Sequence, residues 1–414
     1  MTNSSSKNMK LISHNTLTGF GGIGEGVSLQ VAKGGRRIMW LAHEGAPKNF
    51  TGVDVTDIKN TKVICQTELP HKNMRSNSLE VCDDILAVAY QTIGPGGRAI
   101  DPGYNLEPAG IELFDISNPE EPKTISFFDC HGPGSSGVHQ LWFVDGEYIH
   151  FSGGAPDHIA RHDRDTQFYR CIDVKDPTKP TDVGRWWYPG TKEGDVEDPP
   201  TRHPVFDNGF RAHNTNVYPE RPDRVYMGYL DGGTIILDIS DKAHPKMVSQ
   251  WNPHPPFPGF THTALPLLDK DLLIVSDECN KNGGEDWPKL NWVVDMREET
   301  NLVPISTFPM PDFEEFGRRG GRFGAHNLHE NRPGPSFKSS KTIFATLFNA
   351  GVRAYDISDP FIPVETAHFI PEDPEKSRAN CAQINDVFVD DNQIVYCVDR
   401  FSGGLYCLEM EIDI

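Results

Sequence analysis

The sequence of 414 residues has no long apolar run, and this absence excludes one class of protein at the outset. A membrane-spanning helix needs about 18 or more consecutive apolar residues, and no segment approaches that length. The polar start, residues 1–10, also lacks the apolar centre of a secretory signal. The sequence therefore predicts a cytoplasmic protein with no membrane partner.

Basic residues are scarce as well, with 39 Lys and Arg against 59 Asp and Glu, for a formal net charge of −20. Such an excess of negative charge repels nucleic-acid phosphates and anionic lipid surfaces. We therefore expect no nucleic-acid partner and favour a small-molecule substrate.

The eight cysteines never form a CxxC pair, which argues against a thiol-based metal or redox motif. Most of them fall inside strand-like runs, where a reduced and buried thiol is the common state. The 38 Gly and 33 Pro are dispersed along the chain rather than clustered. This distribution predicts many short elements joined by turns.

One phrase recurs through the chain: an apolar pair, an Asp, an apolar residue and a polar turn that ends in Pro. Clear copies are LFDISNPEEP, CIDVKDPTKP, ILDISDKAHP and AYDISDPFIP, and weaker copies are GVDVTDIKNT and VVDMREETNLVP. An Asp side chain can accept a hydrogen bond from the backbone of its own turn, and Pro is excluded from central strands. We therefore predict that the repeated aspartates hold tight turns: Asp54, Asp115, Asp173, Asp238, Asp295 and Asp356.

Each copy stands between β-rich runs, which predicts a unit of four strands with the phrase between the third and the fourth. A seventh unit begins near Ala382 and ends after its third strand, while residues 9–17 resemble the missing fourth strand. We expect an all-β fold, a seven-bladed β-propeller with four-stranded blades, closed by pairing of the N-terminal strand into the last blade. The prediction is a single domain over residues 1–414, with residues 1–8 disordered.

The phrases LFDISNPEEP, ILDISDKAHP and AYDISDPFIP make the sequence resemble LVIVD-repeat β-propeller proteins. The resemblance covers nearly the whole chain and implies the propeller architecture, but it implies no particular activity. The sequence departs from the pattern at residues 293–304, where the repeat is degenerate, and at long insertions in residues 91–109 and 153–170.

Alignment of the units on their second strands puts one residue of each unit at the start of the innermost strand, facing the central channel. These positions are Gly26, Asn77, His139, His213, His262, His326 and Asn385. Imidazole binds Zn, Cu, Fe and Ni, and ligands on one side of a pore leave coordination positions open for substrate or dioxygen. We predict a mononuclear divalent metal on His139, His213, His262 and His326, with Fe(II) favoured and Cu, Mn or Zn as alternatives.

The loops between the second and third strands should reach the same mouth of the channel, and four of their side chains are candidate catalytic residues: His43, Glu44, Glu278 and Arg400. A carboxylate beside imidazole could orient a metal ligand or act as a general base, and Glu278 and Glu44 suit these roles best. His329 should point to a different level from His326, and its role stays open between packing and support of the metal. The basic run at residues 317–322 either attracts an anionic substrate or is a solvated loop.

These residues favour a metal-dependent oxidoreductase or oxygenase acting on a small organic molecule, with aromatic compounds and alkenes as candidates. The expected site resembles, in geometry only, those of carotenoid-cleavage-type non-haem iron oxygenases. Three alternatives stay open: a lactonase-like metal-dependent lyase or hydrolase, a copper-dependent thiol oxidase similar to methanethiol oxidase and the selenium-binding proteins, and a non-catalytic propeller that binds a partner. Substrate, metal and oligomeric state are left open as well.

Overall fold

The computed structural model describes residues 4–20, 22–93 and 107–414, and the regular structure in these ranges is almost entirely β. The helical turns described there are η1 (Leu17–Gly19) and α1 (Phe313–Phe316). The predicted all-β fold without long helices is confirmed. Within the same ranges, no helix is long and apolar enough to cross a membrane. Most of the insertion at residues 91–109, namely residues 94–106, lies outside the described residues.

Most strands form antiparallel sheets of four, in which each strand pairs with the next along the chain. Three sheets follow this order without interruption, and their strands are β13 (Val138–Trp142), β14 (Tyr148–Gly153), β15 (Phe168–Asp173), β16 (Thr181–Trp186), β17 (Thr215–Tyr218), β18 (Arg221–Gly228), β19 (Thr234–Asp238), β20 (Lys246–Trp251), β21 (Thr261–Leu267), β22 (Leu272–Asp277), β23 (Asn291–Asp295) and β24 (Val303–Thr307).

Two further groups of four strands are joined into one eight-stranded sheet by the pair His43–Ser76 between the second strand of one group and the first of the next. Their strands are β3 (Ile23–Val31), β4 (Arg37–His43), β5 (Lys48–Asp54), β6 (Lys62–Glu68), β7 (Met74–Cys82), β8 (Ile85–Thr92), β9 (Gly110–Asp115) and β10 (Lys123–Asp129). A small separate hairpin follows, made of β11 (His131–Gly132) and β12 (Ser135–Ser136).

The two ends of the chain meet in the remaining sheets. The N-terminal strand β2 (Met9–Asn15) pairs with β30 (Leu405–Met410), in a sheet completed by β29 (Ile394–Asp399) and β28 (Ile384–Val389). The other sheet contains β25 (Thr342–Thr346), β26 (Val352–Asp356), β27 (Val364–Ile370) and, at its outer edge, β1 (Ser5–Lys7).

Of the residues 1–8 that the sequence predicts to be disordered, residues 1–3 lie outside the described residues, and residues 5–7 form the strand β1. Residues 5–7 pair with residues 368–370 of β27 through the backbone, and Ser5 Oγ lies 3.1 Å from His368 Nε2. An edge strand of this kind needs backbone pairing but no apolar side chain, so the polar composition of the segment did not reveal it.

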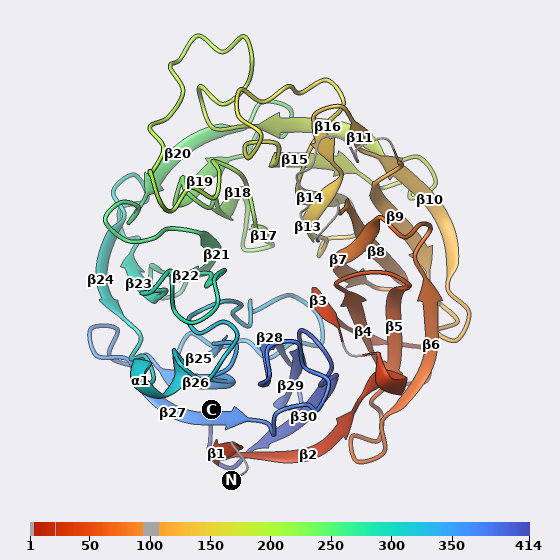
Figure 1. The fold of residues 1–414 in the computed structure, drawn as a ribbon. Helices are drawn as coiled ribbons and strands as arrows, with labels where there is room; N and C mark the ends of the chain where they lie inside the picture. The colour runs from red at the N-terminus through yellow and green to blue at the C-terminus, as the bar shows by residue number, and fades with distance from the viewer. Residues whose placement is uncertain (1–3, 21, 94–106) are drawn as a thin grey trace.

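Figure 1 shows the sheets curled around a central axis, with β3, β7, β13, β17, β21 and β28 nearest to it. The repeated aspartates lie at the turn to the outermost strand. Each accepts a hydrogen bond at Oδ1 from the backbone N–H two residues later, at 2.7–3.0 Å: Asp54, Asp115, Asp173, Asp238, Asp295 and Asp356. The predicted structural role of these residues is thus confirmed.

Apolar side chains fill the space between neighbouring sheets, and large ones such as Trp40, Trp142 and Tyr226 are fully buried there. The innermost strands differ, because they also carry buried polar side chains. Buried polar groups require hydrogen-bond partners, so any that lack a partner need an explanation.

Candidate metal centre

The four histidines of the predicted site lie on consecutive sheets, at the same end of their innermost segments. His139 is on β13, His262 is on β21 and His213 stands two residues before β17. His326 belongs to an irregular segment that pairs with β25 through an isolated bridge between Leu328 and Ala345. From His139 to His326, successive ring centroids are 4.4, 3.8 and 4.6 Å apart. The four imidazoles therefore form one contiguous row, which we call the histidine row.

A break in strand register turns side chains towards the axis at this level. In β13 and β21 the register shifts at His139 and His262, and in β7 and β28 it shifts at Asn77 and Asn385. A bulge leaves one residue unpaired and re-aims its side chain. The recurrent bulge explains why a single position in these units reaches the channel.

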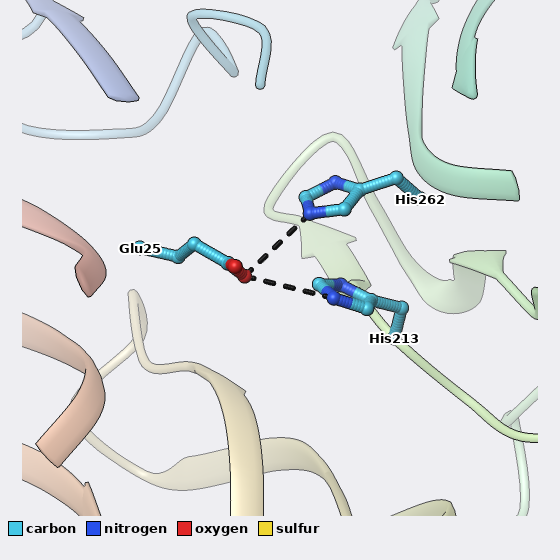
Figure 2. Close-up of side chains that lie close together, drawn as sticks. All are labelled: Glu25, His213 and His262. Atoms are coloured by element: carbon cyan, nitrogen blue, oxygen red, sulfur yellow. Dashed lines mark ion pairs between the residues drawn. The ribbon is translucent and has the colours of Figure 1, made fainter. Parts of the chain in front are cut away.

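A carboxylate that sequence reasoning missed faces the histidine row. Glu25 lies on β3, where the register with β4 skips from Ile23 to Val27, and it is 3% exposed. Its carboxylate oxygens stand 3.5–3.9 Å from the Nε2 atoms of all four histidines, two of which appear in Figure 2. The sequence predicts Gly26 at this position, which is wrong by one residue because the irregular stretch of β3 is longer than the other bulges.

The glycines on either side of Glu25 let β3 approach β7 closely. A Cβ atom at Gly24 would lie 2.6 Å from the carbonyl oxygen of Asn77, and one at Gly26 would lie 2.4 Å from the backbone nitrogen of Leu79. Glycine alone avoids such contacts. Glu25 could have been found from the sequence by one signal. It is an acidic residue between two glycines, in the first unit, next to the position that aligns with the histidines.

Each ring of the histidine row is oriented by an oxygen atom at Nδ1, at 2.7–2.9 Å. The pairs are His139 with Gln91 Oε1, His213 with Asn214 Oδ1, His262 with Thr263 Oγ1, and His326 with the backbone carbonyl of Asn385. An acceptor at Nδ1 favours the tautomer that carries its hydrogen there. The Nε2 lone pairs are then unprotonated and point to the region in front of Glu25.

Neighbouring side chains hold two of these acceptors in place. Arg75 donates to Gln91 Oε1 from Nε at 3.1 Å and from Nη2 at 2.8 Å, which orients that amide oxygen. Arg75 Nη2 also lies 3.4 Å from His139 Nδ1, but this contact is longer than the 2.9 Å contact of that ring with Gln91. Asn214 donates from Nδ2 to Glu330 at 2.6 Å, which leaves its oxygen for His213.

Three atoms at the centre are buried without a hydrogen-bond partner among the described residues: Glu25 Oε2, His262 Nε2 and His326 Nε2. The Nε2 atoms of His139 and His213 are 2.8 Å apart, so two lone pairs face each other when both rings carry hydrogen on Nδ1. Ligand atoms that share one ion at about 2.1 Å stand about 3 Å apart. Because unpaired buried groups are destabilising, this arrangement calls for a cation, and the nitrogen-rich donors fit a divalent transition metal.

Burial favours the neutral, metal-binding form of three of the four rings. It lowers the pKa of His139 and His326, and it lowers the pKa of His213 to about 3. Burial alone would raise the pKa of Glu25, but contacts with His262 and His326 outweigh it and hold that pKa well below its usual range. At neutral pH His139, His213 and His326 therefore offer neutral imidazole nitrogens, and Glu25 offers an ionised carboxylate.

Among the predicted catalytic residues, Glu278 lies beside the histidine row. Its side chain is 6% exposed, and Oε1 stands 3.7 Å from His326 Nε2 and 2.6 Å from Arg322 Nη1. Although burial acts to raise the pKa of Glu278, interactions with His326 and Arg322 lower it. Two groups of residues have candidate ligand atoms within 4.8 Å of one another: Glu25 with His213 and His262, and Glu278 with His262 and His326.

Glu44 and Arg400 lie further from the row and contact each other. Arg400 Nη2 stands 3.0 Å from Glu44 Oε1, and Arg75 Nη1 stands 2.6 Å from Glu44 Oε2. Arg400 Nη1 also lies 4.0 Å from Glu278 Oε1. A carboxylate shared by two guanidinium groups is suited to positioning those groups rather than to accepting a proton.

His43 belongs to neither of the two close groups. Its Nε2 lies 2.7 Å from Thr51 Oγ1 on β5, and its ring packs edge-on against Phe20. The ring thus contacts the third strand of its own sheet, and a catalytic role for His43 stays a prediction.

His329 has both ring nitrogens engaged by the backbone. Nε2 lies 2.7 Å from the carbonyl oxygen of Phe337, and Nδ1 accepts from the N–H of Val389 at 3.2 Å. Of the two roles left open by the sequence, this geometry favours packing.

Comparison with known proteins supports the fold. The LVIVD repeat family matches residues 223–252, which include the phrase ILDISDKAHP. Comparison with curated proteins gives no match. Among the 720 chains of solved structures that match is a protein from Lactobacillus plantarum, with 10% identity, a TM-score of 0.55, and coverage of 89% of this chain and 93% of that chain. At this identity the likeness concerns the fold alone, which is propeller-like, and the LVIVD repeat is shown by the family match.

Proposed function

We propose that this protein is a metal-dependent enzyme with a mononuclear centre at the axis of the fold. His139, His213, His262 and His326 would supply nitrogen ligands, and Glu25 would supply a carboxylate oxygen. The observation that carries the proposal is the convergence of these buried atoms, several of which have no hydrogen-bond partner within the described chain.

Fe(II) is the favoured metal, with Cu, Mn and Zn as alternatives. Imidazole suits all of the late first-row metals, and the addition of one hard carboxylate oxygen is typical of non-haem iron sites that keep open positions. When bound, the ion would supply Lewis acidity and, for iron or copper, one-electron chemistry with dioxygen.

The proposed activity is that of an oxidoreductase on a small organic molecule. Glu278 is the side chain suited to hold or move a substrate proton, because it is ionised and stands 3.7 Å from His326 Nε2. Arg322 fixes that carboxylate at 2.6 Å, and Arg400 with Glu44 supports the surrounding wall. These residues would position the substrate against the metal face that the histidines leave open.

A metal-dependent lyase or hydrolase is the second candidate. Glu278 favours it specifically, because a carboxylate beside a Lewis-acidic ion can move a proton while the ion polarises a carbonyl group. This reaction needs neither dioxygen nor a change of metal oxidation state, so the two candidates can be separated by experiment.

We also propose that the sheets are the blades of a closed seven-bladed ring. The supporting pairings are the groups β3–β6, β7–β10, β13–β16, β17–β20 and β21–β24, the sheet of β25–β27 with the segment around His326, and the sheet of β28–β30 with β2. Pairing of β2 with the C-terminal strand β30 would close the ring and leave no long edge exposed.

Metal analysis of protein purified without chelator or nickel affinity tests the centre. We expect about one equivalent of iron or copper per chain, and its loss in the double variant His213→Ala/His262→Ala. The matched control is His244→Ala, which removes an imidazole whose side chain is 77% exposed. Equal metal content in the double variant, or none in the wild-type protein after anaerobic loading with Fe(II), would reject the centre.

Oxygen consumption tests the reaction class. Iron-loaded protein is mixed with a panel of small aromatic and alkene compounds in an oxygen electrode, while products are followed by mass spectrometry. Product formation with matching oxygen uptake supports the oxidoreductase. Product formation at the same rate without oxygen supports the lyase or hydrolase instead.

A further inference from the structure

A cavity of about 860 Å³ lies at the end of the channel where Glu44 and Arg400 meet. The charged residues that line it in the described part of the chain are five basic and one acidic: Lys72, Arg75, Arg322, Arg378, Arg400 and Glu44. The whole chain has the opposite balance, with a net charge of −20. The positive lining is therefore a local feature that composition does not explain, and a positive cleft concentrates anions.

Ion pairs neutralise only part of this charge. Arg75 and Arg400 share the one carboxylate of Glu44, and Arg322 pairs with Glu278. Three guanidinium groups are thus paired with only two carboxylates, so these ion pairs leave an excess positive charge in the cavity lining.

The remaining basic residues stand on the rim. Lys72 and Arg378 are exposed, and neither forms an ion pair with a carboxylate among the described residues. Arg378 instead lies over the ring of Phe401, 4.9 Å from its centroid. Both side chains keep donors available for an incoming anion.

Arg211 adds a positive charge next to the histidine row. It precedes His213 by two residues, and its Nε is buried with no hydrogen-bond partner in the part of the chain that the structure describes. Arg211 is not among the described residues that line the cavity, so it acts on a bound anion through its charge rather than by contact.

The same cavity has an apolar part. Phe20, Ile93 and Phe401 contribute to its lining. Aromatic and aliphatic walls favour the carbon skeleton of a ligand, while a few charged groups fix its orientation. The ligand that matches both parts is an organic anion rather than an inorganic one.

We propose that the substrate is a small organic carboxylate. Its carboxylate would bind to the basic lining residues Lys72 and Arg378, and its unsaturated or aromatic body would lie against Phe20 and Phe401, directed towards the histidine row. This inference rests on the proposed metal centre, because it assigns the substrate of that same site.

Calorimetric titration of the metal-loaded full-length protein tests the proposal with cinnamate and with cinnamamide, which has the same shape but no charge. We expect cinnamate to bind at least about tenfold more tightly at low salt, with the difference shrinking as ionic strength rises. Phenyl phosphate is the third probe, because guanidinium groups also bind phosphate.

Substitutions of basic residues test which side chains bind the carboxylate of cinnamate. Lys72→Gln/Arg378→Gln should weaken cinnamate about tenfold and leave cinnamamide unchanged, as expected for the loss of two charge-assisted contacts. The matched control is Lys33→Gln/Arg297→Gln, which removes two exposed basic side chains outside the cavity lining. Arg211→Gln should also weaken cinnamate, and Arg211→Lys should restore part of the affinity with metal content unchanged in both.

The outcomes separate the two proposals. Equal affinity for cinnamate and cinnamamide, or unaltered binding in Lys72→Gln/Arg378→Gln, overturns the carboxylate substrate while the metal content of the same samples still supports the centre. Binding of phenyl phosphate in place of cinnamate overturns the assignment to a carboxylate. Absence of metal from the wild-type samples rejects the proposed centre itself.

Discussion

The channel has two sides with the same backbone and different side chains. On β7 and β28 the bulge carries an asparagine, whereas on β13 and β21 it carries a histidine. Asn385 Nδ2 donates to the carbonyl oxygen of Gly24 at 2.9 Å, and Asn77 Nδ2 donates to that of His139 at 3.3 Å. These amides bond one strand to the next, whereas His262 Nε2 has no such partner among the described residues.

This comparison separates structural from functional polar residues. A bulge that points into the channel stabilises the fold when its side chain reaches a neighbouring backbone. The same bulge becomes a ligand position when its side chain is bonded on one side and left unpaired on the other. Glu25 sharpens the contrast, because it comes from the unit between the two asparagines and yet faces the histidine row.

The largest effect is expected from Glu25→Gln, which keeps the shape of the side chain and removes its charge. Metal affinity should fall by about 100-fold or more, since loss of even an outer hydrogen-bond partner of a ligand typically costs 10–100-fold. Competition with a chromophoric chelator measures the change, and thermal melting verifies that the variant is folded. Unchanged affinity would show that Glu25 is not a ligand and belongs with the structural amides.

A smaller effect is expected when the orientation of one histidine is disturbed. Thr263→Val removes the oxygen that lies 2.7 Å from His262 Nδ1, and metal affinity should fall about tenfold. Thr215→Val is the matched control, because Thr215 Oγ1 is buried with no hydrogen-bond partner in the described residues. Similar metal affinities in the two variants would contradict the role assigned to the Nδ1 acceptors.

A buried histidine outside the row provides the reference for acid sensitivity. Burial lowers the pKa of His150 to about 3, whereas an unfolded histidine titrates near 6.5. Its contribution to stability is therefore complete above about pH 6.5 and is lost as the pH falls towards about 3, by up to about 1.4 kcal/mol per pH unit. Denaturant unfolding at pH 6 and pH 5 should show a shallower pH dependence for His150→Gln than for wild type, with metal content unchanged.

The smallest effect is expected at the repeated turns, far from the channel. Asp115→Ala removes the acceptor of the Ser117 N–H, at 2.9 Å, and should lower the free energy of unfolding by about 1 kcal/mol. Metal content should stay the same as in the wild-type protein. A loss of metal in this variant would mean that the metal centre depends on the turns to the outer strands. It would contradict the assignment of a purely structural role to these turns.

The turns and strands could be predicted because their signals are local. An Asp whose side chain bonds the backbone two residues later leaves the same short phrase in each unit, whatever lies around it. The histidines could be predicted for a related reason: they occupy equivalent positions in repeated units, so the period of the repeat aligned them without coordinates.

Glu25 and His43 show where this reasoning stops. The long irregular stretch of β3 shifts the channel position from Gly26 to Glu25, and a change of one residue in a strand reverses the direction of its side chain. His43 is predicted in the loop after the second strand but is the last residue of β4, and its ring is directed to Thr51 rather than to the row. Neither outcome has a local signature, since both depend on how two neighbouring strands pair.

The sequence by itself determined the all-β class, the repeated turns and the four histidines, because these follow from contacts within a unit and from the spacing of units along the chain. Only the tertiary structure decided which carboxylates face those histidines, which nitrogen of each ring faces Glu25, and that the cavity near them has a mainly basic lining. Such features arise where segments hundreds of residues apart converge on one axis, and the physical chemistry of a site depends on that convergence rather than on sequence order.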